Sequence, residues 1–379
     1  MSRTYSDQEG ARAMPTKTIL AAATALALGQ GTAQPIPSVS ATTTYHRVEI
    51  DGVGIFYREA GPRDAPTVLF LHGYPSSSRQ WDPLLPLLAD RYHLIAPDYP
   101  GFGQSDAPSP AQYTYTFDNL AKTIEGLVAH LGTERYTLFL QDYGGTVGFR
   151  MALAHPERVS ALIVQNANAY VEGLGPKWQG IARFWADPGA HPEQLDAFTS
   201  LEGAKQRHLG TSPNPERYNP DTWADEYAIL ARPGEREIQA ALLYDYRINV
   251  ACYPAWQAWL RGHPLPTLVL WGRYDPSFIV PGAEAYLRDV PKAELHILDA
   301  GHFALDEATD EVARLTRDFL GRVETSALPS SPPVETPSSS SSVRHWHNRA
   351  RELPSGDVGF RGAAEWPGWA RNCQSPIAR

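Results

Sequence analysis

Cysteine and long hydrophobic runs are both scarce in this sequence. The 379 residues include only two cysteines, Cys252 and Cys373, which lie far apart and have no metal-ligand spacing around them. This scarcity excludes a disulfide framework and a zinc site as the organising principle of the fold. A transmembrane helix needs about 18 or more consecutive apolar residues. Because no such run occurs, we expect no membrane span.

Positive charge is in deficit as well. The chain has 33 Lys and Arg against 42 Asp and Glu, a net charge of -9. Nucleic acid is therefore excluded as the main partner, because neutralising its phosphates requires a basic surface. No G-x-G-x-x-G or P-loop motif stands between a strand-like and a helix-like segment. We therefore predict neither a cofactor nor a metal.

The N-terminal residues have the order of a secretory signal. Lys17 precedes the apolar run 19–28, and small residues follow at 31–33, where a signal peptidase would cut. We predict a signal peptide over residues 1–33, with Met14 as a possible start, and export to a periplasm or out of the cell. The alternative is an alanine-rich helix without a targeting role, in which case the protein stays in the cytoplasm.

The C-terminal residues have low complexity. Prolines and serines dominate residues 329–342 without any helical or strand period. Segments of this composition cannot bury a hydrophobic face. We therefore predict that residues 325–379 form a disordered tail without a function of its own.

Between these ends, strand-like and helix-like segments alternate. The strand-like runs are 67–71, 93–98, 137–141, 161–164, 267–271 and 294–298, and the helical periods are 82–89, 117–131, 145–154 and 305–320. This alternation predicts an α/β fold, in which helices cover both faces of a mostly parallel sheet. Two further runs, 47–50 and 54–58, predict an antiparallel lead-in that turns at Asp51-Gly52.

One interval interrupts the alternation. Residues 169–264 contain no buried strand signal, only helical stretches rich in Trp, Tyr and Pro. We predict that they form a helical cap, or lid, inserted before the penultimate strand. Such a cap would lie over the C-terminal ends of the strands, where sheets of this kind bind ligands. The core domain is then assigned to residues 45–168 and 265–322.

Three residues with catalytic potential follow three different strands. Asp142 stands in the strand-to-helix turn 140–145, Leu-Gln-Asp-Tyr-Gly-Gly, which is the pattern of a nucleophile elbow. Asp275 and His302 follow two later strands. Taken singly, Asp142 also fits a helix N-cap, Asp275 a turn and His302 a buried core histidine. Their order along the chain favours a shared catalytic role.

Together these motifs resemble the α/β-hydrolase superfamily, in the branch with an Asp nucleophile that comprises epoxide hydrolases and haloalkane dehalogenases. The resemblance covers residues 45–322 and includes the segment Pro97–Ser105 after the second strand. It implies the α/β-hydrolase fold. It also implies a triad of Asp142 as nucleophile, Asp275 as acid and His302 as base.

The resemblance further implies an oxyanion hole made of two backbone N–H groups. One is that of Tyr143, directly after the nucleophile, and the other is that of Tyr74 in the segment His72-Gly73-Tyr74-Pro75. The elbow departs from the expected G-x-S-x-G pattern, because an aspartate replaces the serine and Gln141 follows Leu140, where a glycine is common.

The aspartate at the serine position has a chemical meaning. A serine would form an ether at a saturated carbon, and water does not readily cleave an ether. A carboxylate is already ionised at neutral pH, since its reference pKa is about 3.9, and it forms an ester when it opens an epoxide or displaces a halide. His302 would activate the water that hydrolyses this ester, while Asp275 orients the imidazole. The predicted substrate is a small, mainly apolar molecule.

The choice between epoxide and halide depends on the groups around the leaving atom. Epoxide hydrolases protonate the emerging alkoxide with two lid tyrosines. The segment Leu243–Arg247 resembles their Tyr-Arg motif, which makes Tyr246 the candidate proton donor and Tyr170 a weaker candidate for the second tyrosine. The alternative for Tyr246 is a packing role in an amphipathic helix.

Halide release requires side-chain N–H donors, which many dehalogenases supply from Trp and Asn. Here Tyr143 and Tyr74 stand at those places, so a donor would have to come from a lid residue such as Trp178 or Trp185. Epoxide hydrolysis to a diol is therefore the leading prediction, and haloalkane dehalogenation is the alternative. A secreted binding protein that has lost catalysis is an alternative from another class, since fold does not imply function.

Overall fold

The structure is a computed structural model, and it describes residues 42–327. The predicted signal, 1–33, lies outside these residues, as does almost all of the predicted tail, 325–379, so both stay predictions. Within the described range, no helix combines the length and apolarity needed to cross a membrane.

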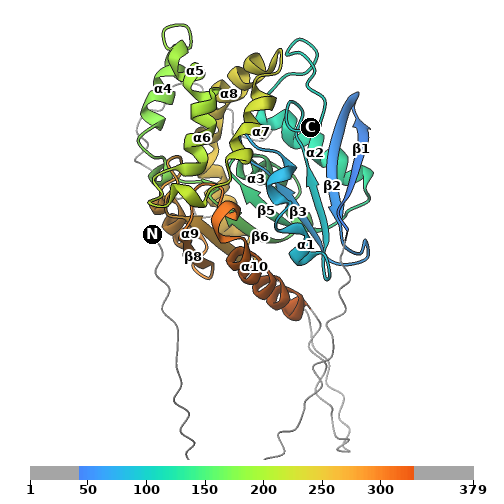
Figure 1. Cartoon of the computed structure of the whole chain (residues 1–379). Coiled ribbons are helices and arrows are strands. Elements are labelled where there is room, and N and C mark those ends of the chain that lie inside the picture. Colours follow the sequence, from blue (N-terminus) through green and yellow to red (C-terminus); the bar gives the residue numbers. More distant parts are fainter. Residues whose placement is uncertain (1–41, 328–379) are drawn as a thin grey trace, which may run out of the picture. The chain divides into compact units, whose positions relative to one another are not determined.

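An eight-stranded sheet lies at the centre of the described residues (Figure 1). Its strands are β1 (Thr44–Ile50), β2 (Val53–Ala60), β3 (Thr67–Leu71), β4 (His93–Pro97), β5 (Tyr136–Gln141), β6 (Val159–Gln165), β7 (Thr267–Gly272) and β8 (Glu294–Leu298). Their order across the sheet is β1-β2-β4-β3-β5-β6-β7-β8. β2 pairs antiparallel with β1 and β4, and every other pair is parallel. The α/β prediction and its antiparallel lead-in are confirmed.

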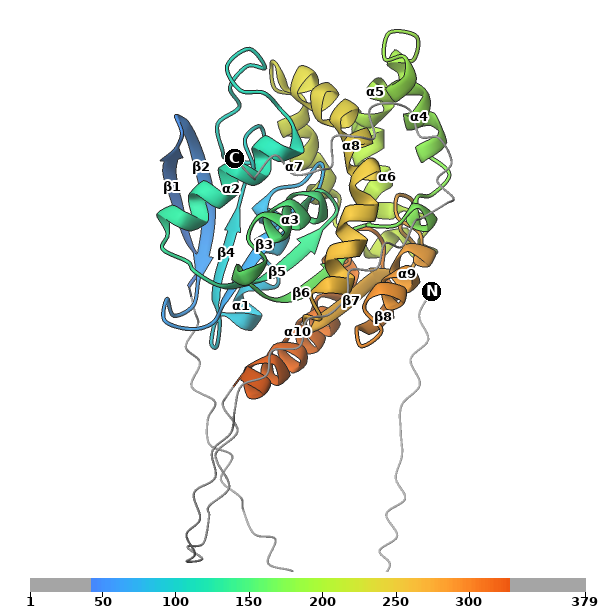
Figure 2. The same ribbon diagram turned by 180° about the vertical axis from the view of Figure 1, so that it is seen from behind.

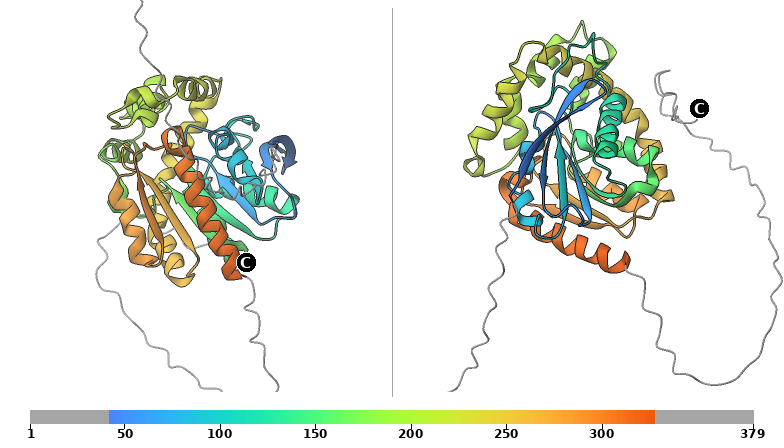
Figure 3. Two further views of the ribbon diagram at one scale, coloured as in Figure 1. Left: turned by 60° about the horizontal axis from the view of Figure 1, so that its bottom comes forward. Right: turned by 90° about the vertical axis from the view of Figure 1, so that its right-hand side faces the viewer.

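Helices cover both faces because successive side chains of a buried strand point into two different apolar layers. The helices that flank the sheet are α1 (Leu85–Leu88), α2 (Phe117–His130), α3 (Tyr143–Ala154), α9 (Val280–Asp289) and α10 (Leu305–Ala327). Phe70 and Phe139 belong to the layer under α1 and α10, and Leu71 and Leu140 to the layer under α2, α3 and α9. Figure 2 shows α2, α3 and α9 on the near side, and Figure 3 shows α10 lying across the sheet.

Five longer helices separate β6 from β7, in the interval where the sequence predicts a cap. They are α4 (Trp178–Ala186), α5 (Pro192–Phe198), α6 (Leu201–Leu209), α7 (Pro220–Leu230) and α8 (Glu235–Gly262). In Figure 1, α4 to α7 gather at one end of the sheet. These helices, the segment that leads into α4 and the first half of α8 are called the cap below, purely as a name for this part of the chain. The second half of α8 packs on the sheet layer instead, because Trp256 stacks on Phe149 of α3 with ring centroids 5.1 Å apart. The single helix α8 therefore joins cap and core.

A buried ionic cluster ties the cap to the core. His208 of α6 contacts Glu226 of α7 at 2.9 Å through Nε2 and Asp306 of α10 at 2.6 Å through Nδ1. Burial alone would lower the pKa of His208, but the charges and hydrogen bonds of the two carboxylates raise it to about 10. The imidazolium is thus held between two anions, and α6 and α7 are fixed against α10.

Candidate active site

The turn between β5 and α3 holds Asp142 in a strained backbone conformation. Its φ of 48° and ψ of -112° lie outside the usual regions for a residue with a side chain. The backbone around this turn is packed so closely that two neighbouring positions have room only for glycine. A Cβ on Gly144 would lie 1.9 Å from the carbonyl oxygen of Leu71, and one on Gly73 would lie 2.4 Å from the Asp142 Cβ. The Asp142 side chain makes no helix-capping hydrogen bond, so it is available to other groups.

The structure brings Asp142, Asp275 and His302 together at the C-terminal ends of β5, β7 and β8. His302 Nδ1 lies 2.7 Å from Asp275 Oδ2, and His302 Nε2 lies 3.5 Å from Asp142 Oδ2. All three side chains are buried. The imidazole therefore lies between the two carboxylates, with a separate ring nitrogen facing each one.

Asp275 is held by four hydrogen-bond donors. Oδ1 accepts the backbone N–H groups of Ser277 at 2.6 Å and Phe278 at 3.0 Å. Oδ2 accepts the side-chain amide of Asn166 at 2.8 Å in addition to His302. Because both oxygens are satisfied, the carboxylate is fixed in the orientation that meets His302 Nδ1.

Asn166 links Asp142 and Asp275, and it was not predicted from the sequence. It follows β6 with φ of 45°, a conformation that asparagine tolerates better than most residues. Its carbonyl accepts the N–H of Asp142 at 3.3 Å, while its side chain contacts Asp275 and exchanges hydrogen bonds with Gly272. Its position directly after a buried strand was the sequence feature that could have marked it as a site residue.

The two oxygens of Asp142 have different surroundings. Oδ1 accepts the backbone N–H of Tyr74 at 2.8 Å, whereas Oδ2 faces His302. Burial alone would raise the pKa of Asp142, but His302 and the backbone N–H groups of Tyr74 and Tyr143 lower it below its usual value. The carboxylate is thus kept ionised, and both predicted oxyanion donors lie at this side chain.

His302 is basic despite its burial. Burial alone would lower its pKa, but the charge of Asp275 and hydrogen bonds with Asp142 and Asp275 raise the pKa to about 9. At neutral pH the ring is therefore an imidazolium between two anions. Loss of either negative charge would make it easier for the ring to give up its proton.

Replacing Asp142 by asparagine tests this coupling. We expect the pKa of His302 to fall from its value of about 9, because one of the two anions that raise it is removed. NMR titration of the ring nitrogens measures the shift. His208 serves as the internal control, because its pKa of about 10 depends on Glu226 and Asp306 instead and should not change. An unchanged His302 pKa would show that Asp142 does not influence the imidazole.

Gln141, which directly precedes Asp142 in the turn, supports the position of His302. Its side-chain amide donates to the carbonyl oxygen of His302 at 3.3 Å, and the amide of Gln165 on the neighbouring strand donates to the same oxygen at 3.3 Å. Both glutamines are buried. The two strand ends therefore fix the backbone that carries the histidine.

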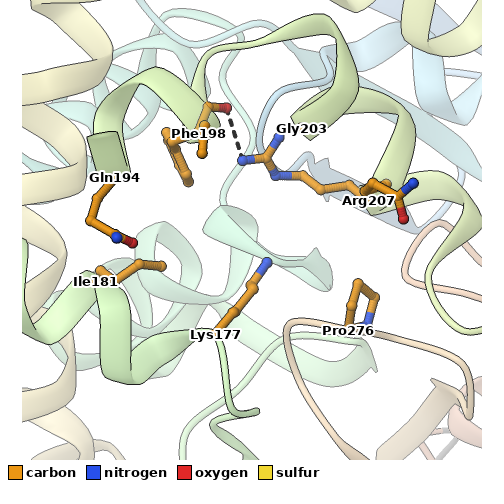
Figure 4. Close-up of a pocket in the computed structure, with 9 residues that line it drawn as sticks. Lys177, Ile181, Gln194, Phe198, Gly203, Arg207 and Pro276 are labelled. Atoms are coloured by element: carbon orange, nitrogen blue, oxygen red, sulfur yellow. Dashed lines mark hydrogen bonds between the residues drawn. The ribbon is translucent and has the colours of Figure 1, made fainter. Parts of the chain in front are cut away.

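A narrow space lies directly over Asp142. It has a volume of about 20 Å³ and is lined by Asp142, His302, both oxyanion tyrosines and the cap residues Lys177, Trp178, Ile181, Phe198, Arg207 and Leu243, with Ser277. A larger cavity of about 200 Å³ shares four of these walls, and Figure 4 shows its lining. Lys177 and Arg207 were not identified from the sequence, because their place at the nucleophile depends on how the cap folds.

The two lid tyrosines have different environments. Tyr246 is buried with its ring centroid 5.7 Å from Tyr143 and 4.7 Å from Trp178. It thus packs behind two residues that line the narrow space over Asp142. Its hydroxyl has no hydrogen-bond partner among the described residues. Burial, followed by the nearby Tyr253 and Asp142, raises its pKa well above the usual value.

Tyr170 lies elsewhere. Its ring packs 4.9 Å from that of Tyr286 on α9, and the guanidinium of Arg288 lies 5.1 Å from its centroid. It does not line either of the two spaces beside Asp142. Tyr246 is not among the lining residues either, but it packs against Tyr143 and Trp178, which are, whereas Tyr170 packs against α9.

The lid tryptophans use their N–H groups for packing within the protein. Trp178 Nε1 donates to the carbonyl oxygen of Ser277 at 2.9 Å, and Trp185 Nε1 donates to that of Leu243 at 2.7 Å. Neither N–H is therefore free to hold a halide. Within residues 42–327, no cluster of three His, Cys, Asp or Glu side chains is arranged to hold a metal ion.

Comparison with known proteins agrees with this geometry. A family model described as alpha/beta hydrolase fold matches residues 66–309, a range that contains Asp142, Asp275 and His302. An uncharacterized hydrolase of Saccharomyces cerevisiae is 40% identical over 269 residues, which are 69% of this chain and 92% of the yeast protein.

Two more distant similarities concern proteins with named activities. Epoxide hydrolase 3 of Xenopus tropicalis is 28% identical over 73% of this chain and 77% of its own. The crystal structure of a loop variant of a haloalkane dehalogenase from Bradyrhizobium elkanii has a TM-score of 0.61 at 25% identity, and the match covers 76% of this chain and 99% of that one.

Proposed function

The chain belongs to the alpha/beta hydrolase fold family, and on that premise we propose that it hydrolyses epoxides to diols through a covalent ester on Asp142. One observation carries the proposal. The carboxylate has one oxygen bound by the N–H of Tyr74 and the other facing the Nε2 of His302. An aspartate held in this way is arranged to attack a saturated carbon and then to be released by water.

In the first step, Asp142 Oδ2 attacks a ring carbon of the epoxide from the side opposite the C–O bond. That bond breaks, and its electron pair passes to the ring oxygen. The emerging alkoxide takes a proton from the hydroxyl of Tyr246, which has no hydrogen-bond partner of normal geometry within residues 42–327. The products of this step are an uncharged ester of Asp142 and a tyrosinate.

In the second step, His302 acts as a base. Esterification removes the negative charge of Asp142, which is one of the groups that raise the pKa of His302 to about 9. The imidazolium can then pass its proton to the tyrosinate of Tyr246, and the neutral ring takes a proton from a water. That water attacks the carbonyl carbon of the ester, and the N–H groups of Tyr74 and Tyr143 stabilise the oxyanion. Collapse of the intermediate expels the alkoxide, which takes the proton of the new carboxyl group, so that the diol leaves and both the carboxylate and the imidazolium are restored.

The surroundings of the leaving atom favour an epoxide over a halide. An epoxide oxygen needs a proton donor, and Tyr246 packs behind two residues that line the narrow space over Asp142, with a buried hydroxyl that has no hydrogen-bond partner of normal geometry among the described residues. A halide needs N–H donors, but those of Trp178 and Trp185 are bonded to backbone carbonyl oxygens. The similarity to a haloalkane dehalogenase structure keeps halide displacement as the second candidate.

A matched pair of substrates tests the proposal. Styrene oxide and (2-bromoethyl)benzene offer the same aryl group with different leaving atoms, and diol and bromide are measured separately. We expect diol formation to exceed bromide release by about 10²-fold, the size of a general-acid contribution that only the epoxide uses. Faster bromide release would favour dehalogenation. Absence of both products and of any covalent adduct would favour the non-catalytic alternative.

A further inference from the structure

Two cationic side chains stand where the larger cavity meets the space over the nucleophile. The two spaces share four wall residues, namely Lys177, Ile181, Phe198 and Arg207. Figure 4 shows the side chains of Lys177 and Arg207 reaching into the same region from opposite sides. A molecule that extends from Asp142 into the larger cavity must therefore pass between an ammonium and a guanidinium group.

Arg207 is a buried cation without a carboxylate. Its residue is only 7% exposed. Nη2 donates to the carbonyl oxygen of Phe198 at 3.0 Å, but Nη1 is buried and has no hydrogen-bond partner among the described residues. The guanidinium lies 4.5 Å from the ring centroids of Tyr74 and Phe198. The two aromatic rings stabilise the positive charge at the faces of the guanidinium group. The Nη1 edge stays without a hydrogen-bond partner among the described residues, which is rare for a buried arginine.

Lys177 adds a second positive charge to the same wall. It precedes α4, and its ammonium donates to the hydroxyl of Ser277. Burial and then the charge of Arg207 lower its pKa to about 8, while the charges of Asp275 and Asp142 oppose part of this decrease. The two cations are therefore close enough to repel each other, and the active-site carboxylates offset that repulsion only in part. Neither residue forms an ion pair with a carboxylate within residues 42–327. Two like charges at one buried place are unfavourable unless an anion lies between them.

We propose that Lys177 and Arg207 bind a carboxylate group of the substrate, so that the preferred epoxides are short epoxy acids. This inference rests on the proposed function for the reacting end of the molecule and adds recognition of the opposite end. It changes the sequence-based expectation of a mainly apolar substrate.

The shape and size of the site select this class. A carboxylate has two oxygens, which suit the free Nη1 of Arg207 and the remaining protons of Lys177. The amides of Gln194 and Gln206 line the same cavity. Its volume of about 200 Å³ is below the range of about 300–1,000 Å³ typical of ligand pockets. A chain of a few carbons between epoxide and carboxylate therefore fits better than a long or branched one.

The kinetic test compares 3,4-epoxybutanoate with its neutral amide, 3,4-epoxybutanamide. For the wild-type protein we expect the KM of the acid to be lower by about 10- to 100-fold, the range given by charged hydrogen bonds. Arg207→Met and Lys177→Met should each raise the KM of the acid by about 10-fold or more. The same variants should change the KM of the amide by less than about threefold. Because both side chains also line the space over Asp142, a change in kcat that is equal for acid and amide is set aside, and the acid-to-amide ratio of kcat/KM is the quantity that tests the carboxylate site.

Arg183→Met is the matched control. Arg183 is exposed on α4, so its loss removes one positive charge from the same cap helix without touching the cavity. We expect no change in the acid-to-amide ratio. If circular dichroism shows that Arg207→Met does not fold, the Lys177→Met variant and the acid-to-amide KM ratio of the wild type still test the proposal. Equal KM values for acid and amide in the wild type would overturn the proposal.

A binding measurement separates this proposal from the proposed function. Calorimetry of butyrate against butyramide needs no turnover. We expect butyrate to bind the wild type and to lose about 10-fold or more in affinity in Arg207→Met and Lys177→Met. This result without any epoxide turnover would support the carboxylate site while contradicting epoxide hydrolysis. Equal binding of both ligands, or tighter binding of propylphosphonate than of butyrate, would contradict a carboxylate site.

Discussion

Replacing His302 by alanine should lower kcat by roughly 10³-fold or more, as expected for loss of a catalytic base. At the same time, a substrate-derived mass should accumulate on the chain. Alkylation requires only the Asp142 carboxylate, whose backbone is held by the turn and whose Oδ1 is bound by Tyr74. Hydrolysis of the ester additionally requires a base for the water. Intact-protein mass spectrometry measures the adduct, and peptide mapping should place it on the peptide that contains Asp142.

Several variants control this experiment. His302→Gln fills more of the buried site than alanine and should also trap the ester, which separates loss of the base from collapse of the cavity. Asp142→Ala should show neither turnover nor adduct. Asp142→Ser should not restore hydrolysis, because the ether it would form resists water. An adduct on another residue, or full turnover by Asp142→Ala, would contradict the assignment of the nucleophile.

The second large effect concerns the proton donor. Tyr246→Phe removes a single hydroxyl and keeps the ring that packs against Tyr143 and Trp178. Because the hydroxyl has no hydrogen-bond partner of normal geometry in the described part of the chain, its loss should cost little stability. Epoxide turnover should fall by about 10²-fold or more if this hydroxyl protonates the alkoxide. Steady-state kinetics on styrene oxide and thermal unfolding measure the two quantities.

Tyr170→Phe provides the comparison for that variant. Its ring packs against Tyr286 and Arg288, away from the walls of the nucleophile site. We expect this substitution to change epoxide turnover by less than about twofold, because general-acid catalysis requires hydrogen-bond reach. Equal losses in the two variants would indicate a shared structural effect. An unchanged rate in Tyr246→Phe would remove Tyr246 from the mechanism.

The elements that the sequence predicted well are those with local signals. The six strands predicted after the lead-in have boundaries within two residues of the prediction. Five of them contain a continuous apolar run that ends at a polar or glycine residue, whereas Glu294–Leu298 includes a glutamate and a histidine and is only partly buried. Helix α9 was not predicted. Pro281 and Gly282 fall in its first turn, where proline suits a helix start but also reads as a loop in the sequence. Its apolar face, which includes Tyr286, is too short to give a clear period.

The residues of the candidate site also fall into those with a local sequence signal and those without one. The sequence by itself determined the α/β core, the strand-to-helix turn at Asp142 and the order Asp142, Asp275, His302, because each of these depends on a few neighbouring residues. The tertiary structure alone decided which distant residues meet them. Asn166 reaches Asp275 across 109 positions, and Lys177 and Arg207 reach the nucleophile through the packing of the cap. Such contacts have no local pattern, since they depend on how helices pack over the sheet. The substrate class that we infer therefore comes from the fold of the cap rather than from any motif.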